Sequence, residues 1–254
     1  MRDTAASSEP LMTIAWETPS SWPRLSDDEI HVWCVELDAA GEVAALAACL
    51  SEDERERASG LLSGTHQRRF VVARGMLRQL LGWYLGQDPG AVAFAHGAHG
   101  KPFLQEGGLH FNVSHTHELA LYAIARDREV GVDVEWMRPQ VAHEQIAARF
   151  FSIEEQGALA EVPDEERRVA FYNIWTRKEA YVKARGDGIA AGLGTFAVSL
   201  GAEAVLLRSD EGRDEVARWK LMALEPAAGY VAALCGAGVD WQVQGWRWRS
   251  YKIN

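Results

Sequence analysis

The chain has 254 residues, of which 48% are hydrophobic and 24% are charged, as in ordinary globular proteins. This length allows one large or two small domains with a sizeable hydrophobic core. The formal net charge of −10 argues against a protein built to bind nucleic acid or an anionic membrane.

The cysteines and the first residues indicate the compartment. Cys34, Cys49 and Cys235 show neither a CxxC motif nor a disulfide pattern, as expected in a reducing environment. The first ten residues lack a basic-then-apolar signal, and no apolar run is long enough to span a bilayer. We therefore expect a cytoplasmic protein, and we expect a monomer.

The first part of the chain is predicted to be a loose arm, residues 1–27, followed by an N-terminal α/β half, residues 28–127. The elements expected in this half are a strand at 30–37, a helix at 41–50, a helix capped by Ser51-x-x-Glu54, a long helix at 66–85, a turn at 97–102, and strands at 109–115 and 119–125.

A C-terminal α/β half is predicted for residues 128–254. Its expected elements are an acidic strand at 130–136, a helix at 140–151, a helix capped by Ser152-x-x-Glu155, a long helix from Pro163 to Gly186, strands at 195–200, 204–208, 218–223 and 230–235, and a Trp-rich end.

Three short patterns recur in the same order in both halves. They are Ser51-x-x-Glu54 with Ser152-x-x-Glu155, Arg68-Arg69 with Arg167-Arg168, and Phe111-x-Val113-Ser114 with Phe196-x-Val198-Ser199. We therefore predict an α+β fold of two similar α/β halves related by a pseudo-two-fold. Ligands favour interfaces between such halves, so we expect the site there.

The acidic strand and the long helix after it carry the candidate chemistry. Asp133 and Glu135 point to the same face of the strand as Gly131, because side chains alternate along a strand. Glu179 interrupts the apolar stripe of the helix, and Lys183 lies one turn further on. Three converging carboxylates beside a lysine would hold a hard divalent ion next to an anionic substrate. Taken singly, each piece is more often a half-solvated edge strand or a surface ion pair.

Four motifs taken together are more specific. In chain order they are Gly100-Lys101-Pro102, Phe111-Asn112-Val113-Ser114-His115, Gly131-Val132-Asp133-Val134-Glu135, and Trp175-Thr176-Arg177-Lys178-Glu179-Ala180-Tyr181-Val182-Lys183. Their order and spacing resemble the 4′-phosphopantetheinyl transferases, in the Sfp-like branch. The resemblance covers about residues 50–188, and that family is pseudo-two-fold as well.

The resemblance implies an activity. Such enzymes move phosphopantetheine from coenzyme A to a serine of an apo acyl or peptidyl carrier protein, using Mg²⁺, with Mn²⁺ as the alternative metal, and releasing adenosine 3′,5′-bisphosphate. It assigns Asp133, Glu135 and Glu179 as metal ligands, with Glu179 also the general base. Lys183 would bind phosphate and pass the proton, and Lys178 would add positive charge.

A set of residues is expected by resemblance to contact coenzyme A: Arg55, Arg57, Arg69, Lys101, Pro102, Asn112, Ser114, His115, Asp133, Lys178 and Lys183. The alternating acids of Glu54-Arg55-Glu56-Arg57 depart from the lysines that the family often has there. Without the resemblance, Lys101 would be a solvated turn lysine, His115 a strand histidine and Arg69 an exposed helix arginine.

Two other functions stay open at this point. A hydrolase of nucleotide pyrophosphates could use the same carboxylates, and a non-catalytic module could bind carrier proteins. Retention of Asp133, Glu179 and Lys183 counts against the module, since binding alone needs no metal cage. The sequence does not indicate which carrier protein or pathway is served.

Overall fold

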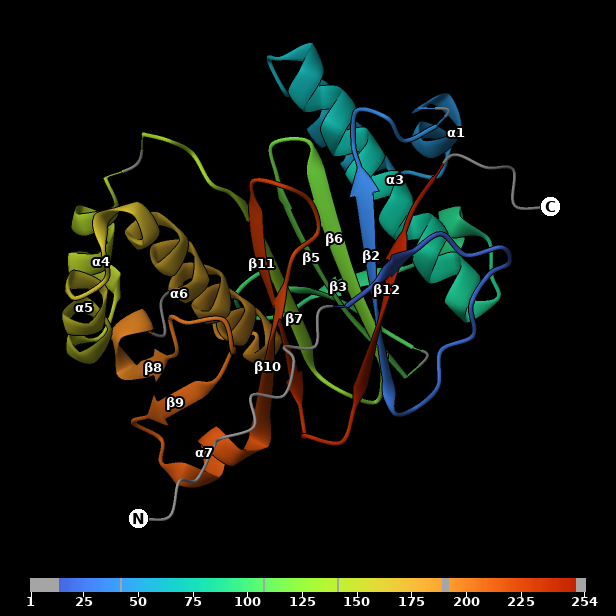
Figure 1. Cartoon of the computed structure of the whole chain (residues 1–254). Helices are drawn as coiled ribbons and strands as arrows, with labels where there is room; N and C mark the ends of the chain where they lie inside the picture. Colours follow the sequence, from blue (N-terminus) through green and yellow to red (C-terminus); the bar gives the residue numbers. More distant parts are fainter. Residues whose placement is uncertain (1–13, 42, 107, 141, 189–191, 250–254) are drawn as a thin grey trace.

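A computed structural model describes residues 14–41, 43–106, 108–140, 142–188 and 192–249 (Figure 1). Its two largest sheets have the strand orders β1-β12-β2-β6-β5 and β10-β11-β7. A 22-residue helix packs on each of them, α3 on the first sheet and α6 on the second. No described helix has both the length and the apolar character needed to cross a membrane.

The elements of the first half follow in chain order. They are β1 (Trp16–Glu17), β2 (Glu29–Glu36), α1 (Val43–Ala48), α2 (Glu52–Ser59), α3 (Gly64–Leu85), the 3₁₀ turn η1 (Pro89–Ala91), β3 (Phe94–His96), β4 (Pro102–Leu104), β5 (Leu109–Thr116) and β6 (Leu119–Arg126).

The rest of the chain contains the second sheet and the last strand. Its elements are β7 (Val130–Trp136), α4 (His143–Phe150), α5 (Ile153–Ala160), α6 (Asp164–Arg185), the 3₁₀ turn η3 (Leu193–Thr195), β8 (Phe196–Val198), β9 (Leu206–Ser209), α7 (Arg213–Arg218), β10 (Trp219–Leu224), β11 (Tyr230–Ala237) and β12 (Gln242–Arg247).

Local signals in the sequence explain the helix boundaries. The amide of Ser152 donates to the Glu155 carboxylate at 2.8 Å, and the amide of Ser51 donates to that of Glu54 at 3.0 Å, as capping boxes require. Helices α3 and α6 end at Gly86 and Gly186, whose φ angles of 67° and 80° favour glycine.

The two halves repeat one arrangement. The order β2-β6-β5 matches β7-β11-β10 strand for strand along the chain, and an eight-residue helix precedes the 22-residue helix in each half. In each half the acid of the capping box forms a buried ion pair with the long helix. Glu54 pairs with Arg78 at 2.5 Å, and Glu155 pairs with Lys178 at 2.8 Å. The predicted α+β fold of two similar halves is confirmed.

One of the three sequence repeats is wrong. Residues 111–114 lie in β5, whereas residues 196–198 form β8, which pairs with β9 in a separate small sheet. The counterpart of β5 in the strand order is β10. The strands β1, β3 and β4 and the helix α7 were not expected from the sequence.

The predicted loose arm is packed on the body where it is described. Trp16–Glu17 pairs in parallel with β12, and the indole of Trp22 stacks on that of Trp83 with ring centroids 4.6 Å apart. Residues 1–13 of the predicted arm lie outside the described residues.

The last strand returns to the first sheet. β12 pairs in parallel with β2, although its residues belong to the predicted C-terminal half. The chain passes from the first sheet to the second between β6 and β7, where the boundary between the halves was placed. The division into domains at residues 127 and 128 stays a prediction.

Candidate active site

The predicted site residues gather where the two sheets meet. β5 and β7 are edge strands, and no backbone ladder joins them among the described residues. Side chains of β5 take its place. The side-chain Oδ1 of Asn112 accepts from the backbone amide of Val132 at 2.9 Å, and the Ser114 hydroxyl oxygen accepts from the backbone amide of Val134 at 3.4 Å. Asn112 and Ser114, predicted to contact coenzyme A, therefore hold β7 against β5.

Asp133 forms the centre of this group. It is buried, and its Oδ1 accepts from the Ser114 hydroxyl at 2.8 Å and from Lys183 Nζ at 2.6 Å. Gly131, on the same face of β7, lets α6 approach, because a Cβ there would lie 2.1 Å from the carbonyl oxygen of Ala180. The absence of a side chain at Gly131 thus brings Lys183 within reach of Asp133.

Glu179 and Glu135 complete the acidic group. Burial, and next the negative charge of Asp133, raise the pKa of Glu179 to about 7. The same two causes, in the same order, raise the pKa of Glu135. Burial also raises the pKa of Asp133, although Lys183 opposes this shift. The three carboxylates therefore lie close enough to interact electrostatically.

Two carboxylate oxygens of this group have no partner. Asp133 Oδ2 and Glu179 Oε1 are buried and receive no hydrogen bond from the described residues. A buried oxygen of this kind is costly, which suggests a missing donor or cation. Even so, no three His, Cys, Asp or Glu side chains of the described chain are arranged to hold a metal ion. The metal-binding role of Asp133, Glu135 and Glu179 stays a prediction.

Basic residues border the carboxylates. Partial desolvation, and then the positive charges of Lys183 and Arg57, lower the pKa of His115, which is exposed. These three residues thus share one electrostatic neighbourhood. The guanidinium of Arg57 also lies over the Phe70 ring, 5.4 Å from its centroid. The structure therefore brings Arg57, one of the departures from the family pattern, towards His115 and Lys183.

Lys101 lies next to the C-terminus of α6. Its Nζ donates to the carbonyl oxygens of Ala184 at 3.0 Å and Val130 at 3.3 Å. Burial lowers the pKa of Lys101 to about 8. Pro102 follows as the first residue of β4. Lys101 thus ties the start of β7 to the end of α6.

Three predicted residues do not join the group. Lys178 is fully buried. Its Nζ lies 2.8 Å from the Glu155 carboxylate and donates to the carbonyl oxygens of Leu193 and Phe196, both at 2.7 Å. Arg69 forms a bidentate ion pair with Asp38, and the guanidinium of Arg55 donates to the backbone carbonyl oxygen of Leu50. Their guanidinium and ammonium groups are occupied by contacts within the fold.

The sequence reasoning missed one neighbour of the acidic group. The Thr116 hydroxyl donates to Glu135 Oε2 at 3.3 Å. Its place in the series Asn112, Ser114 and Thr116, two residues apart on one face of β5, was the available signal.

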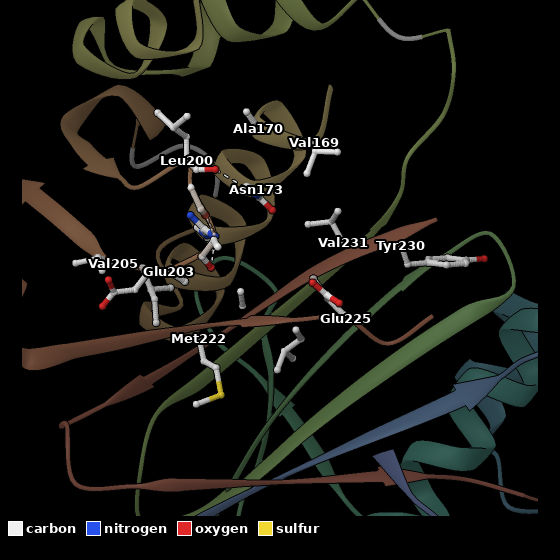
Figure 2. Close-up of a pocket in the computed structure, with 18 of the residues that line it drawn as sticks. Val169, Ala170, Asn173, Leu200, Glu203, Val205, Met222, Glu225, Tyr230 and Val231 are labelled. Carbon is white, nitrogen blue, oxygen red and sulfur yellow. Dashed lines mark hydrogen bonds between the residues drawn. The ribbon is translucent and has the colours of Figure 1, made fainter. Parts of the chain in front are cut away.

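A cavity of about 1230 Å³, separate from the acidic group, lies between α6, β10 and β11 (Figure 2). Val169 and Asn173 line it, and the Asn173 side-chain amide donates to the carbonyl oxygen of Leu200 at 3.0 Å. None of the predicted site residues lines this cavity.

Comparisons with known proteins indicate one family. A family model described as the 4′-phosphopantetheinyl transferase superfamily matches residues 129–235, and one described as 4′-phosphopantetheinyl transferase, N-terminal, matches residues 39–126. The 4′-phosphopantetheinyl transferase HetI of a Nostoc species is 40% identical over 230 residues, covering 88% of this chain and 94% of the relative.

The chain belongs to the 4′-phosphopantetheinyl transferase superfamily.

Other phosphopantetheinyl transferases are similar over shorter stretches. Sfp of Bacillus subtilis is 29% identical over 204 residues, covering 75% of this chain and 89% of the relative. AcpT of Escherichia coli is 33% identical over 148 residues, covering 58% of this chain and 71% of the relative. The predicted family is confirmed. The chain is an enzyme, and its reaction is a phosphopantetheinyl transfer.

Proposed function

We propose that this phosphopantetheinyl transferase uses coenzyme A as donor and a serine of an apo acyl or peptidyl carrier protein as acceptor. The reaction releases adenosine 3′,5′-bisphosphate and depends on Mg²⁺. One observation carries this proposal. Lys183 Nζ lies 2.6 Å from Asp133 Oδ1, and Asp133 Oδ2 and Glu179 Oε1 are buried without a hydrogen-bond partner among the described residues.

The acidic group fits a hard divalent cation. Asp133, Glu135 and Glu179 offer only carboxylate oxygens, the donors that Mg²⁺ prefers, and two of these oxygens are unpaired. These three residues would hold the ion, and Mn²⁺ would find the same donors. When bound, Mg²⁺ supplies positive charge that neutralises the diphosphate of coenzyme A.

Lys183 supports the same role from the protein side. An ammonium group has three donors, and two of them bind Asp133 Oδ1 and the Ser114 hydroxyl, at 2.6 and 3.1 Å. The third is left for a phosphate oxygen of the donor. Arg57 places a second positive charge near His115 and Lys183, although the chain as a whole carries a net charge of −10.

Glu179 is the candidate for the proton transfer. The serine hydroxyl of the carrier must lose its proton as it attacks phosphorus, and a base is most effective when its pKa lies near the working pH. Without a bound cation, burial and the charge of Asp133 raise the pKa of Glu179 to about 7, which keeps this carboxylate close to a neutral working pH. In this proposal Glu179 accepts the proton of the serine hydroxyl, and Lys183 binds the phosphate that the serine attacks.

The setting of the enzyme is also a proposal. Cys34, Cys49 and Cys235 are free, which supports a reducing, cytoplasmic location. We expect the protein to act as a monomer, since one chain supplies both halves that contribute residues to the proposed site.

Intact-mass measurement of apo carrier proteins tests the proposal. Each carrier is incubated with the enzyme, coenzyme A and Mg²⁺, and a gain of one phosphopantetheine group on a carrier is the expected result. Omission of Mg²⁺ should prevent it. Release of free phosphopantetheine without any carrier would indicate a hydrolase instead. Tight carrier binding without a change of mass would indicate a binding module.

A further inference from the structure

Thr116 ends a row of polar side chains on β5. Asn112 and Ser114 accept from the backbone of β7, but the hydroxyl of Thr116 donates to a side chain, the carboxylate of Glu135. Thr116 is only 9% exposed, so water competes little for this bond. Among the described residues, no other hydrogen bond to the Glu135 carboxylate is present.

Glu135 needs such a partner because the charges around it favour a position away from Asp133. The charge of Asp133 repels its carboxylate, and the exposed Arg138 attracts it more strongly than Lys183 does. Glu135 lies next to the end of β7, is half-buried, and has a side chain with three rotatable bonds. Without a fixed donor, both forces favour a rotamer directed towards Arg138.

We infer that Thr116 is a positioning residue, whose hydroxyl keeps the Glu135 carboxylate beside Asp133 and Glu179 against the pull of Arg138. This rests on the proposed function, in which those three carboxylates hold the divalent ion. Loss of a residue that orients a metal ligand commonly weakens metal binding by about 10- to 100-fold.

The turn after Thr116 holds it in place. His117 has a φ of 52°, unusual for a residue other than glycine, and its ring packs at a tilt of 33° against Trp136 with centroids 4.6 Å apart. Trp136 directly follows Glu135 in β7. The contact thus fixes the end of β5 against the end of β7, so the Thr116 hydroxyl stays in reach of Glu135.

The test measures Mg²⁺ binding by titration calorimetry on the full chain saturated with coenzyme A, without carrier, so that no transfer occurs. Thr116→Val keeps the shape of the side chain and removes the hydroxyl. We expect the dissociation constant for Mg²⁺ to rise about 10- to 100-fold. The affinity for coenzyme A without metal should stay within about threefold, because the one hydrogen bond of the Thr116 hydroxyl among the described residues is to Glu135.

Two further variants separate positioning from a packing effect. Thr116→Ser restores a hydroxyl and should bind Mg²⁺ within about threefold of the unchanged chain. Adding Arg138→Gln to Thr116→Val removes the competing cation and should recover part of the lost affinity. Thr195→Val is the matched control and should leave Mg²⁺ binding unchanged, because among the described residues the Thr195 hydroxyl donates only to the carbonyl oxygen of Gly192.

The outcomes are distinct. Mg²⁺ binding by Thr116→Val equal to that of the unchanged chain would overturn the role of Thr116 while leaving the proposed function intact. So would an equal loss in Thr116→Ser and Thr116→Val. Absence of Mg²⁺ binding by the unchanged chain would overturn the metal part of the proposed function, and this inference with it.

Discussion

Trp33 occupies in β2 the position that Asp133 occupies in β7. Counting from Ile30 and Val130, the first residues of the equivalent ladders, both are fourth, and both lie on the face towards the long helix of their half. The repeated fold therefore presents an acid at this position in one half and a buried indole in the other.

The same contrast holds for the rest of the acidic group. Aligning the ladders and the two 22-residue helices from their first residues places Val35, Gln79 and Trp83 at the positions of Glu135, Glu179 and Lys183. Trp22, Trp246 and Trp248 pack around Trp33. An aromatic cluster thus fills the equivalent position in the first half, and among the described residues the acidic group is confined to the second half.

Replacing Glu179 by glutamine should remove the base and keep the shape. We expect transfer to apo carrier protein to fall by at least about 100-fold, the range of general-base catalysis. Coenzyme A affinity should change little, and the surface variant Glu154→Gln should transfer normally. Turnover of Glu179→Gln at the unchanged rate would exclude Glu179 from the chemistry.

Replacing Lys183 by methionine should weaken donor binding. The ammonium group donates to Asp133 and Ser114 and has one donor left for phosphate. A hydrogen bond to a charged group contributes about 1.5–3 kcal/mol, so we expect coenzyme A affinity to fall about 10- to 100-fold. Calorimetric titration measures it, with Lys220→Met as control. An unchanged dissociation constant would contradict phosphate binding by Lys183.

Replacing Lys178 by methionine should affect stability and not donor affinity. It leaves the buried Glu155 carboxylate without its cation, which commonly costs about 3–5 kcal/mol of unfolding free energy. Urea denaturation measures this loss, and adding Glu155→Gln should recover part of it. A selective loss of coenzyme A affinity with unchanged stability would restore the phosphate role predicted from the sequence.

His31 should make the protein less stable in mild acid. Burial lowers its pKa from 6.5 to about 4, although Glu29 opposes the shift. Below pH 6.5 the unfolded chain binds a proton that the folded chain excludes, so stability from neutral His31 is lost as the pH falls from 6.5 towards 4.

The variant His31→Gln isolates this effect from that of the acidic group, whose raised pKa values act in the opposite direction. The difference in unfolding free energy between the unchanged chain and the variant should shrink by about 2–3 kcal/mol between pH 7.5 and pH 4.5. A constant difference across that range would mean that His31 does not titrate as its burial indicates.

Short-range patterns in the sequence were enough to predict much of the site. The alternation in residues 130–136 directs Asp133 and Glu135 to one face, and the spacing of Glu179 and Lys183 puts them on one side of α6. The capping boxes and the glycines after α3 and α6 mark helix ends through contacts within a few residues. These interactions are local, so the sequence alone determines them.

Contacts between distant segments were decided only by the tertiary structure. Lys178 is next to Glu179 in the motif, but packing of α6 turns its ammonium group into the core towards Glu155. The return of β12 to β2 and the seam between β5 and β7 depend on how whole sheets pack. Neighbouring residues point to different sides of a helix. Which side faces the acidic group depends on the elements that pack around the helix.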